Sequence, residues 1–291
     1  MKILLINTKT FHAKHLPAMP LGPLAIATYL TDNGHIVRIF DREAERGNNK
    51  ADESFAPDLV GIAGHSYENF PDALKLSKVY HRKNIPVVWG GQRASLIPDA
   101  VLKTGVVDFV VIGEGEITFL ALLNAMMNQT PIKDIDGLAY IENGEIVINK
   151  DRELTPLSEL PIIDFSFINP EKYCGPYIGC RKMLNIHASK GCAFQCTYCY
   201  NSCLSKGAWR ARPAEYYLSE IKYLVENFKI DGVFFVDDLF GPSPAYLQSV
   251  CDRILESNLG IVWGCYTRAD LCSKEALQKM LRVCPAPGEK F

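Results

Sequence analysis

Short apolar runs alternate with helix-like stretches as far as Met127 of this 291-residue chain. The expected strands are Lys2–Ile6, Ile36–Phe40, Leu59–Ala63, Val87–Trp89 and Phe109–Ile112. The expected helices are Leu21–Asn33, Pro71–Arg82, Leu96–Thr104 and Ile117–Met127. Continuous apolar runs are typical of strands buried on both faces, and their alternation with helices predicts an α/β fold with a parallel sheet between two helical layers.

Five such strands favour a flavodoxin/Rossmann-like, doubly wound sheet with strand order 2-1-3-4-5. At about 100–200 residues per domain, the length suggests about two domains. After the sheet, Asn143-Gly144 lies between two alternating runs and predicts a hairpin, and the proline-rich stretch Asp151–Pro176 predicts an extended linker. We therefore expect a Rossmann-like domain over 1–135, a hairpin and linker over 136–180, and a second α/β region over 181–291.

Charge and hydropathy exclude several classes of protein. The 31 Lys and Arg residues nearly balance the 33 Asp and Glu residues, so nucleic acid is not expected as a partner. No run of about 18 apolar residues occurs, so no transmembrane segment is expected. The start, MKILLIN, resembles a strand more than a secretory signal, which favours a cytoplasmic protein. G-x-G-x-x-G does not follow the first strand and no P-loop pattern occurs, which disfavours dinucleotide and P-loop sites.

Glycines gather where the third, fourth and fifth predicted strands end. Ligands of open α/β sheets bind at this carboxyl edge, and glycine lets the backbone approach a ligand closely because it has no Cβ. The competing interpretation, about equally favoured, is that these are ordinary turn glycines. The candidate ligand-binding residues are Gly64, Gly90, Gly91, Gly113, Glu114 and Gly115.

All ten cysteines lie at or after Cys174. Cys192, Cys196 and Cys199 have the spacing C-x3-C-x2-C and follow a predicted strand, Met183–Ala188. Thiolates at this spacing can converge on one soft metal centre, and three ligands would leave one iron of a four-iron cluster open. With Cys203 as a fourth ligand, the same stretch could instead close a zinc site or a four-cysteine cluster. The other six cysteines are expected to be small apolar residues.

The stretch Lys190-Gly-Cys192-x3-Cys196-x-Tyr198-Cys199 resembles the signature of the radical S-adenosylmethionine (SAM) superfamily. The resemblance implies that the three cysteines hold a [4Fe-4S] cluster, that SAM chelates its fourth iron, and that one electron cleaves SAM to a 5′-deoxyadenosyl radical. It also implies a (β/α) barrel, of which residues 181–291 would form part. The expected elements there are helices Pro213–Phe228, Pro244–Ser257 and Ser273–Val283, and strands Gly232–Phe240 and Ile261–Arg268.

Four residues are implied as SAM contacts. Tyr198 occupies the aromatic position of the cysteine signature. Asp237 and Asp238 end a strand similar to the family's second barrel strand, which ends near the bound nucleoside. Arg268 ends the next strand and could neutralise a carboxylate. The competing interpretations are helix-capping acids for the two aspartates and a surface charge for Arg268.

The front half resembles the cobalamin-binding domain that precedes many radical SAM cores. The resemblance rests on Pro20–Leu30, Gly34-His35, Pro57–Ile62 and the glycine pairs, which are weak singly and strong together. It implies cobalamin as a third cofactor. The D-x-H-x-x-G pattern that supplies a histidine to cobalt in other cobalamin domains is absent, and His12, His15 and His65 are weak candidates for that ligand.

The resemblance as a whole implies a cobalamin-dependent radical SAM enzyme that transfers a methyl group to an unactivated carbon or phosphorus. Its substrate would be a small molecule or peptide, and its electron donor a protein such as flavodoxin or ferredoxin. At about 31 residues per unit, residues 181–291 supply only three or four strand–helix units, and the tail with Pro285 and Pro287 cannot form a central strand. We therefore also expect a truncated chain: a non-catalytic remnant or binding module, or one whose barrel a second chain completes. A zinc-binding regulator that uses Cys203 is the third hypothesis.

Overall fold

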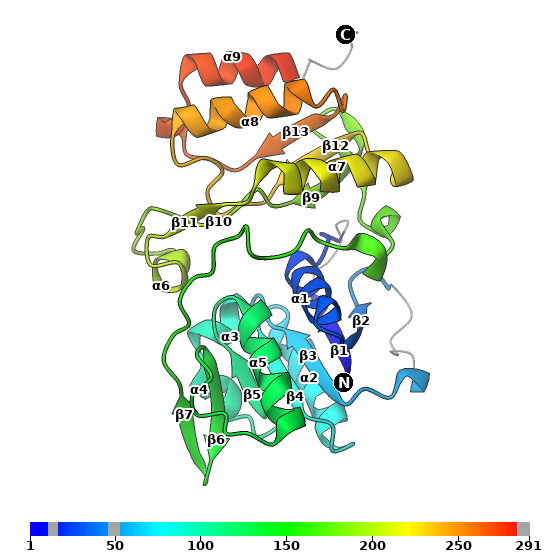
Figure 1. The fold of residues 1–291 in the computed structure, drawn as a ribbon, viewed down its shortest axis with the longest axis vertical. Coiled ribbons are helices and arrows are strands. Elements are labelled where there is room, and N and C mark those ends of the chain that lie inside the picture. The colour runs from blue at the N-terminus through cyan, green and yellow to red at the C-terminus, as the bar shows by residue number, and fades with distance from the viewer. Residues whose placement is uncertain (11–16, 46–52, 284–291) are drawn as a thin grey trace. The chain divides into compact units, whose positions relative to one another are not determined.

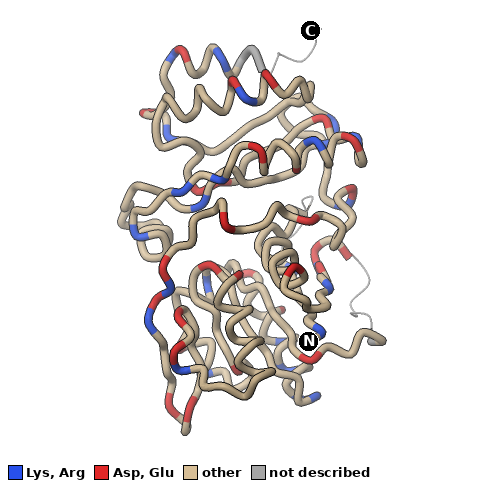
Figure 2. Tube along the Cα trace, viewed as in Figure 1, with Lys and Arg blue, Asp and Glu red and all other residues tan. Residues whose placement is uncertain are grey.

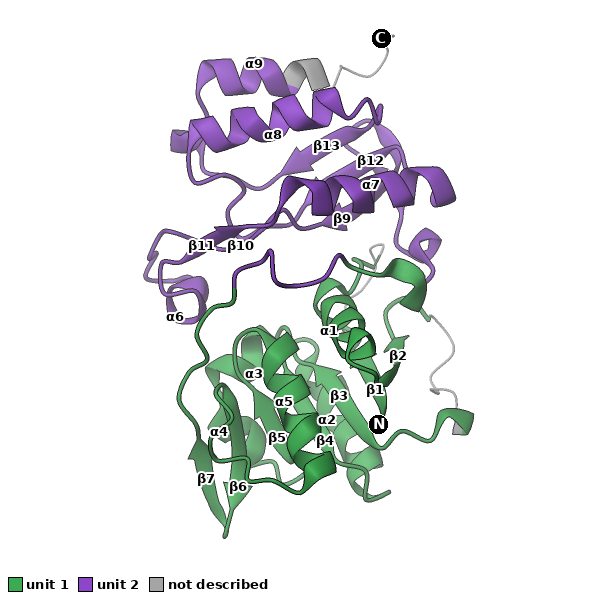
Figure 3. Ribbon diagram, viewed as in Figure 1, with its two compact units in different colours: residues 1–155, 163–168 green, residues 156–162, 169–291 purple. Residues whose placement is uncertain are grey.

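The structure is a computed structural model that describes residues 1–10, 17–45 and 53–283. The chain divides into two compact units (Figure 3). The first contains Met1–Thr155 and Ile163–Ile168, and the second contains Pro156–Ile162 and the chain from Asn169 onward. Acidic and basic residues are interspersed along both units (Figure 2).

The first unit is built on a seven-stranded sheet of order β2-β1-β3-β4-β5-β6-β7 (Figure 1). Its strands are β1 (Lys2–Asn7), β2 (Ile36–Asp41), β3 (Leu59–Ala63), β4 (Val87–Gly90), β5 (Phe109–Val111), β6 (Leu138–Glu142) and β7 (Glu145–Ile148). The first five strands pair in parallel in the order 2-1-3-4-5. The predicted doubly wound sheet is therefore confirmed.

The predicted hairpin is confirmed as β6 and β7. Its turn residues Asn143 and Gly144 have φ values of 52° and 83°, the left-handed conformation that a two-residue hairpin turn requires. Strand β6 also pairs antiparallel with β5, so that Val111 lies opposite Leu138. The hairpin thus extends the sheet of the first unit, whereas the expected boundary at residue 135 would separate it from that sheet.

Helices cover both faces of this sheet. Their bounds are α1 (Leu21–Asp32), α2 (Phe70–His81), α3 (Gln92–Leu96), α4 (Pro98–Leu102) and α5 (Gly115–Asn128), with a short 3-10 turn η1 (Glu53–Phe55). Helices α1 and α5 pack on one core cluster, and α2, α3 and α4 pack on the other. The helix expected over Leu96–Thr104 corresponds to α4 and begins only at Pro98. Proline disfavours the helical conformation in the residue before it, and Ile97, with φ and ψ of −136° and 51°, separates α4 from α3.

The second unit contains a four-stranded sheet of order β13-β12-β9-β8. Its strands are β8 (Gly175–Tyr177), β9 (Cys180–Ile186), β12 (Gly232–Phe235) and β13 (Val262–Cys265), and its helices are α7 (Ala214–Phe228), α8 (Pro244–Glu256) and α9 (Lys274–Val283). Strands β9, β12 and β13 are parallel, whereas β8 is antiparallel to β9. These three parallel strands and their helices agree with the expected partial (β/α) arrangement. The tail at 284–291 lies outside the described residues.

Several short elements of the second unit were not predicted. Besides β8, they are the ribbon of β10 (Ser189–Gly191) and β11 (Trp209–Ala211), the helix α6 (Asn201–Leu204) and the 3-10 turn η4 (Ala269–Leu271). The expected linker contains two more 3-10 turns, η2 (Phe165–Phe167) and η3 (Pro170–Lys172), of which η2 belongs to the first unit. Among the described residues, no helix is both long and apolar enough to span a membrane.

Candidate functional site

The three signature cysteines lie on a loop that a small ribbon closes at its base. Strands β10 and β11 pair antiparallel, with Gly191 opposite Trp209, so that the chain leaves the ribbon at Gly191 and returns at Trp209. Gly191 has a φ of +83°, and a Cβ at this position would overlap the carbonyl oxygen of Ala208. Only glycine therefore fits directly before Cys192, where the loop begins.

Cys192, Cys196 and Cys199 are free and partly exposed on this loop. The backbone N–H of Cys199 donates to the carbonyl oxygen of Cys196 at 3.0 Å, which places these two cysteines on one turn. Within the described ranges, no three His, Cys, Asp or Glu side chains are close enough to hold a metal ion. The donor set nevertheless fits an iron–sulfur cluster, because it consists of accessible, unpaired thiols on one loop. Cys203 is exposed on α6.

Asp237 secures the start of the ribbon. It lies two residues after β12, is 3% exposed, and accepts hydrogen bonds from the backbone N–H of Ala188 at 3.1 Å and from the backbone N–H and hydroxyl of Ser189. Burial raises the pKa of this carboxyl to about 7, although the hydrogen bonds from Ser189 and Ala188 oppose the rise. The Asp237 carboxylate is thus already bound to the chain that leads into the cysteine loop.

Asp238 holds the other end of the cysteine loop through a hydrogen bond with Tyr200, a residue that was not predicted from the sequence. The hydroxyl of Tyr200, the residue after Cys199, donates to the Asp238 carboxylate. Burial, Asp238, Cys199 and Cys192 all raise the pKa of Tyr200. The signal that could have found it is a second aromatic directly after the last cysteine. Tyr198, by contrast, is 91% exposed, so its ring is open to solvent.

Arg268 follows β13 and also lies beside the cysteine loop. Its guanidinium stacks over the ring of Phe194, with 3.9 Å from Cζ to the ring centroid, and pairs with Asp270 at 2.9 Å. Asp270 raises the pKa of Arg268, and the nearby Cys196 and Cys192 raise it further. The ends of β12 and β13 therefore bring two carboxylates and one cation to the cysteine loop.

The glycine edge of the first unit is held by hydrogen bonds between strand ends. The N–H of Gly64 donates to the carbonyl oxygen of Gly90 at 2.9 Å. Ser95, another residue missed from sequence, donates to the carbonyl oxygen of Gly91 at 2.9 Å and accepts from the N–H of Gly113 at 2.9 Å. Gly91 has a φ of +95°, and a Cβ there would lie 3.2 Å from the carbonyl oxygen of Gly64. The edge thus forms a backbone cradle that a side chain at Gly91 would fill.

The other predicted glycine-edge residues lie where β5 meets α5. Gly113 has a φ of +78°, Glu114 is the N-cap of α5, and Gly115 is its first residue. A Cβ on Gly115 would lie 3.1 Å from the Ile26 side chain, so this glycine allows α5 to pack closely on α1. Gly115 therefore has a packing role that does not require a ligand.

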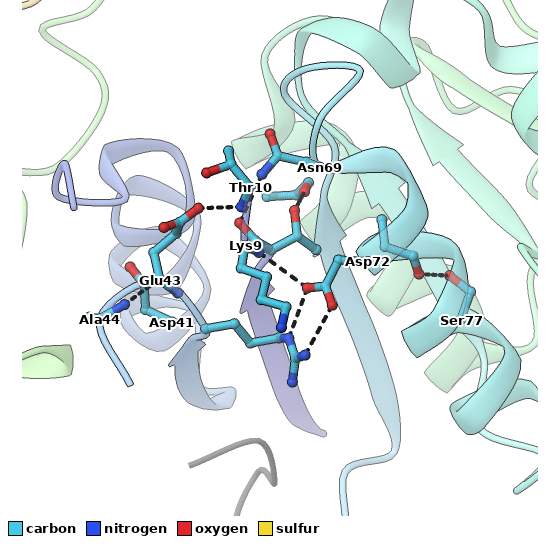
Figure 4. A network of polar contacts seen from close by, with 12 residues as sticks. Lys9, Thr10, Asp41, Glu43, Ala44, Asn69, Asp72 and Ser77 are labelled. Atoms are coloured by element: carbon cyan, nitrogen blue, oxygen red, sulfur yellow. Dashed lines mark hydrogen bonds and ion pairs between the residues drawn. The ribbon is translucent and has the colours of Figure 1, made fainter. Parts of the chain in front are cut away.

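A polar network holds the loop after β1 at the same edge (Figure 4). The guanidinium of Arg42 makes two hydrogen bonds to Asp72, at 2.8 and 3.0 Å, and both side chains are buried. Asp72 also accepts from the N–H of Lys9 at 3.1 Å, and Glu43 accepts from the N–H of Thr10. The histidine candidates His12 and His15 lie outside the described residues, whereas His65 lies beside Gly91.

Comparison with known proteins identifies the first unit. Residues 15–123 match the B12 binding domain family. An uncharacterised methyltransferase of Pyrococcus horikoshii is 28% identical, over 96% of this chain and 62% of its own length. An anaerobic magnesium-protoporphyrin IX monomethyl ester cyclase of Synechocystis is 27% identical, over 88% of this chain and 52% of its own length. The chain therefore spans little more than half the length of these relatives.

A solved structure agrees with both units. The radical SAM methyltransferase TsrM of Kitasatospora setae, solved with tryptophan and a SAM analogue bound, superposes with a TM-score of 0.78 at 18% identity. The match covers 97% of this chain and 57% of TsrM. The expected fold is therefore confirmed, and the hypotheses of a zinc regulator and a non-catalytic module are not favoured. Both units thus have the fold of a radical SAM methyltransferase, and residues 15–123 match a B12 binding domain.

Proposed function

We propose that this chain acts in cobalamin-dependent methyl transfer to an unactivated carbon or phosphorus of a small molecule or peptide. The observation that carries the proposal is the cysteine loop, which the ends of β12 and β13 brace through Asp237, Asp238 and Arg268. The B12-binding domain supplies the second half of the argument. The chain spans 62% of the length of its Pyrococcus relative, so we propose this activity for the whole protein of which such a chain is part.

Cys192, Cys196 and Cys199 would hold the [4Fe-4S] cluster. When bound, the cluster supplies the electron that cleaves the sulfonium C–S bond of SAM, and cobalamin carries the methyl group. Arg268 offsets the negative charge of the cysteine thiolates, and Tyr200 holds the end of the loop against Asp238. The exposed ring of Tyr198 is free to contact SAM. Asp237 positions the chain that leads into the cysteine loop, because its oxygens already accept hydrogen bonds from Ala188 and Ser189.

Cobalamin would lie on the glycine edge of the first unit. Gly64 follows β3, Gly90 ends β4 and Gly91 follows it. Gly113, Glu114 and Gly115 lie where β5 leads into α5. The cradle at Gly91 lets a large ring approach the backbone. A protein electron donor of the flavodoxin or ferredoxin type would reduce the cluster. We also place the reaction in the cytoplasm, where thiols remain reduced.

Anaerobic reconstitution followed by reduction tests this function. With SAM carrying a labelled methyl group, the chain should release 5′-deoxyadenosine, and label should appear on protein-bound cobalamin. Cys199→Ser should abolish both signals, whereas the control Cys174→Ser, outside the loop, should retain them. Release of 5′-deoxyadenosine without methylated cobalamin would instead favour ring-forming chemistry, the activity named for the Synechocystis relative. If a reconstituted chain forms neither 5′-deoxyadenosine nor methylated cobalamin, the proposal is contradicted.

A further inference from the structure

An exposed tyrosine and an arginine stack on each other at the glycine edge of the first unit. Tyr67 lies in the loop after β3 and is 72% exposed. The guanidinium of Arg93, in α3 after β4, lies over its ring with 3.4 Å from Cζ to the ring centroid. The backbone N–H of Arg93 donates to the carbonyl oxygen of Gly64 at 3.2 Å. The stacked pair therefore borders the backbone cradle formed by Gly64 and Gly91.

The side chain of Arg93 has an unused donor. Its Nε is buried and has no hydrogen-bond partner among the described residues. A buried donor without an acceptor is destabilising, and such groups are uncommon in native structures. Arg42, at the same edge, has its guanidinium bonded to Asp72. Arg93 thus differs from its neighbour in lacking the acceptor that its Nε requires.

The chemistry of the pair indicates the ligand. The guanidinium requires an oxygen acceptor, preferably one arranged in a plane with its own N–H groups. The ring of Tyr67 offers an apolar, aromatic surface to a flat ligand. A corrinoid has both features, because its large ring carries carboxamide side chains and, in cobalamin, a phosphodiester. A small inorganic anion would use the guanidinium and leave the tyrosine ring unused.

We propose that Tyr67 and Arg93 form a corrinoid contact in which Arg93 donates to a ligand oxygen and Tyr67 packs against the ligand. This inference rests on the proposed function, because it requires that the first unit binds cobalamin. It adds two side chains to a site otherwise composed largely of backbone. It also gives the glycine edge a charged side chain that donates hydrogen bonds to ligand oxygens, which glycine cannot provide.

Equilibrium titration of the full chain with hydroxocobalamin, followed by absorbance, tests the pair without any turnover. Arg93→Gln should raise the Kd about tenfold, because a charge-assisted hydrogen bond is lost. Tyr67→Ala should raise it about fivefold, and Tyr67→Phe should restore wild-type affinity because the ring remains. The matched control is Arg38→Gln: Arg38 stacks on Phe55 at 4.6 Å from strand β2, and its loss should leave the Kd unchanged.

A second readout separates ligand contact from a structural role. Without cobalamin, Arg93→Gln should keep the thermal midpoint of the wild-type chain or raise it, because the substitution removes an unsatisfied buried donor. A lower midpoint together with unchanged affinity would show that the stack only supports the fold, and would overturn the inference.

Cobinamide, which lacks the nucleotide and its phosphodiester, distinguishes the two oxygen sources. If Arg93→Gln loses affinity equally for cobinamide and cobalamin, Arg93 contacts a carboxamide of the ring. If the variant loses affinity for cobalamin alone, Arg93 contacts the phosphodiester. Both results support the contact. If the wild-type chain binds cobalamin and neither Arg93→Gln nor Tyr67→Ala lowers the affinity, this inference is overturned and the proposed function stands. No binding by the wild-type chain would overturn both.

Discussion

The glycine edge of the first unit and the cysteine loop of the second are held by different kinds of contact. At the glycine edge, backbone groups bond directly across strand ends, as Gly64 does to Gly90. At the cysteine loop, side chains from strand ends reach toward a long loop, as Asp237 and Asp238 do. The glycine edge is formed by contacts within the chain, whereas the three thiols of the cysteine loop are not gathered. Metal sites of this kind are often completed only when the metal binds.

This difference has a physical basis. The backbone cradle of the first unit is closed by hydrogen bonds between strand ends, so the chain alone is enough to form it. The three thiols of the cysteine loop, by contrast, have no metal ion to hold them together, and sites of this kind are commonly completed by the metal itself. The supporting residues at the two ends of the loop keep it within reach of the strand ends.

The largest effect on stability is expected at the polar network of the first unit. Asp72→Asn leaves Arg42 buried without its carboxylate, and removal of one partner from a buried ion pair costs about 3–5 kcal/mol. Urea unfolding measures the change in the free energy of unfolding. The control Asp99→Asn breaks an exposed pair with Lys103 and should change it by less than about 0.5 kcal/mol. Similar small effects for both variants would contradict the claim that the buried Arg42–Asp72 pair stabilises this edge of the first unit.

The next largest effect is expected at the entrance to the cysteine loop. Gly191→Ala introduces a Cβ against Ala208 at a positive φ, and strain with overpacking should cost about 2–4 kcal/mol. Gly260→Ala is the matched control, since Gly260 also has a positive φ but has open space around it. That variant should lose only about 1 kcal/mol. Equal losses in the two unfolding curves would mean that the close approach at Ala208 is unimportant.

Asp237 should make the stability of the second unit depend on pH. Its folded-state pKa is raised to about 7 from 3.8, so between these values the folded chain holds a proton that the unfolded chain releases. Stability should therefore fall as pH rises from about 4 to about 7, and level off above pH 7. Asp237→Asn should remove this slope and weaken the ribbon by about 1–3 kcal/mol, because an amide nitrogen would face an N–H donor. A slope that persists in the variant would exclude Asp237 as its source.

The smallest effect is expected at Tyr200. Tyr200→Phe removes the hydroxyl that donates to Asp238 and should cost about 1 kcal/mol in the cluster-free chain. Tyr216→Phe, which removes an exposed hydrogen bond to the Ser158 carbonyl, should have no measurable effect. Amide hydrogen exchange of residues 196–200 should rise in the first variant alone. Unchanged exchange there would show that Asp238 does not hold the loop.

The sheet of the first unit was predictable because its strands are buried on both faces and therefore read as apolar runs. The four 3-10 turns of the described residues, β8 and the β10–β11 ribbon were not predictable, since elements of three residues are too short to show a period. The attachment of the hairpin to β5 also escaped prediction, because pairing between distant strands leaves no local signal. The predicted strand Gly232–Phe240 ends early, at Phe235, because the chain turns so that Asp237 can bond to Ala188 and Ser189.

The chemistry of the site was predictable only where spacing encodes it. C-x3-C-x2-C identified three thiols on one loop, but Tyr200 and Ser95 act through contacts with residues 38 and 18 positions away. Asp237 shows the limit most clearly. Its place at a strand end was apparent, whereas the bonds that occupy its oxygens depend on how β9 and β12 pair.

Iron and sulfide content of single-cysteine variants tests the central claim most directly. After anaerobic reconstitution, the wild-type chain and Cys203→Ser should each hold about four irons and four sulfides. Cys192→Ser, Cys196→Ser and Cys199→Ser should each lose the cluster and its electron paramagnetic resonance signal on reduction. Zinc without iron in the wild-type chain, or a loss in Cys203→Ser as large as in Cys196→Ser, would contradict a three-cysteine cluster on this loop.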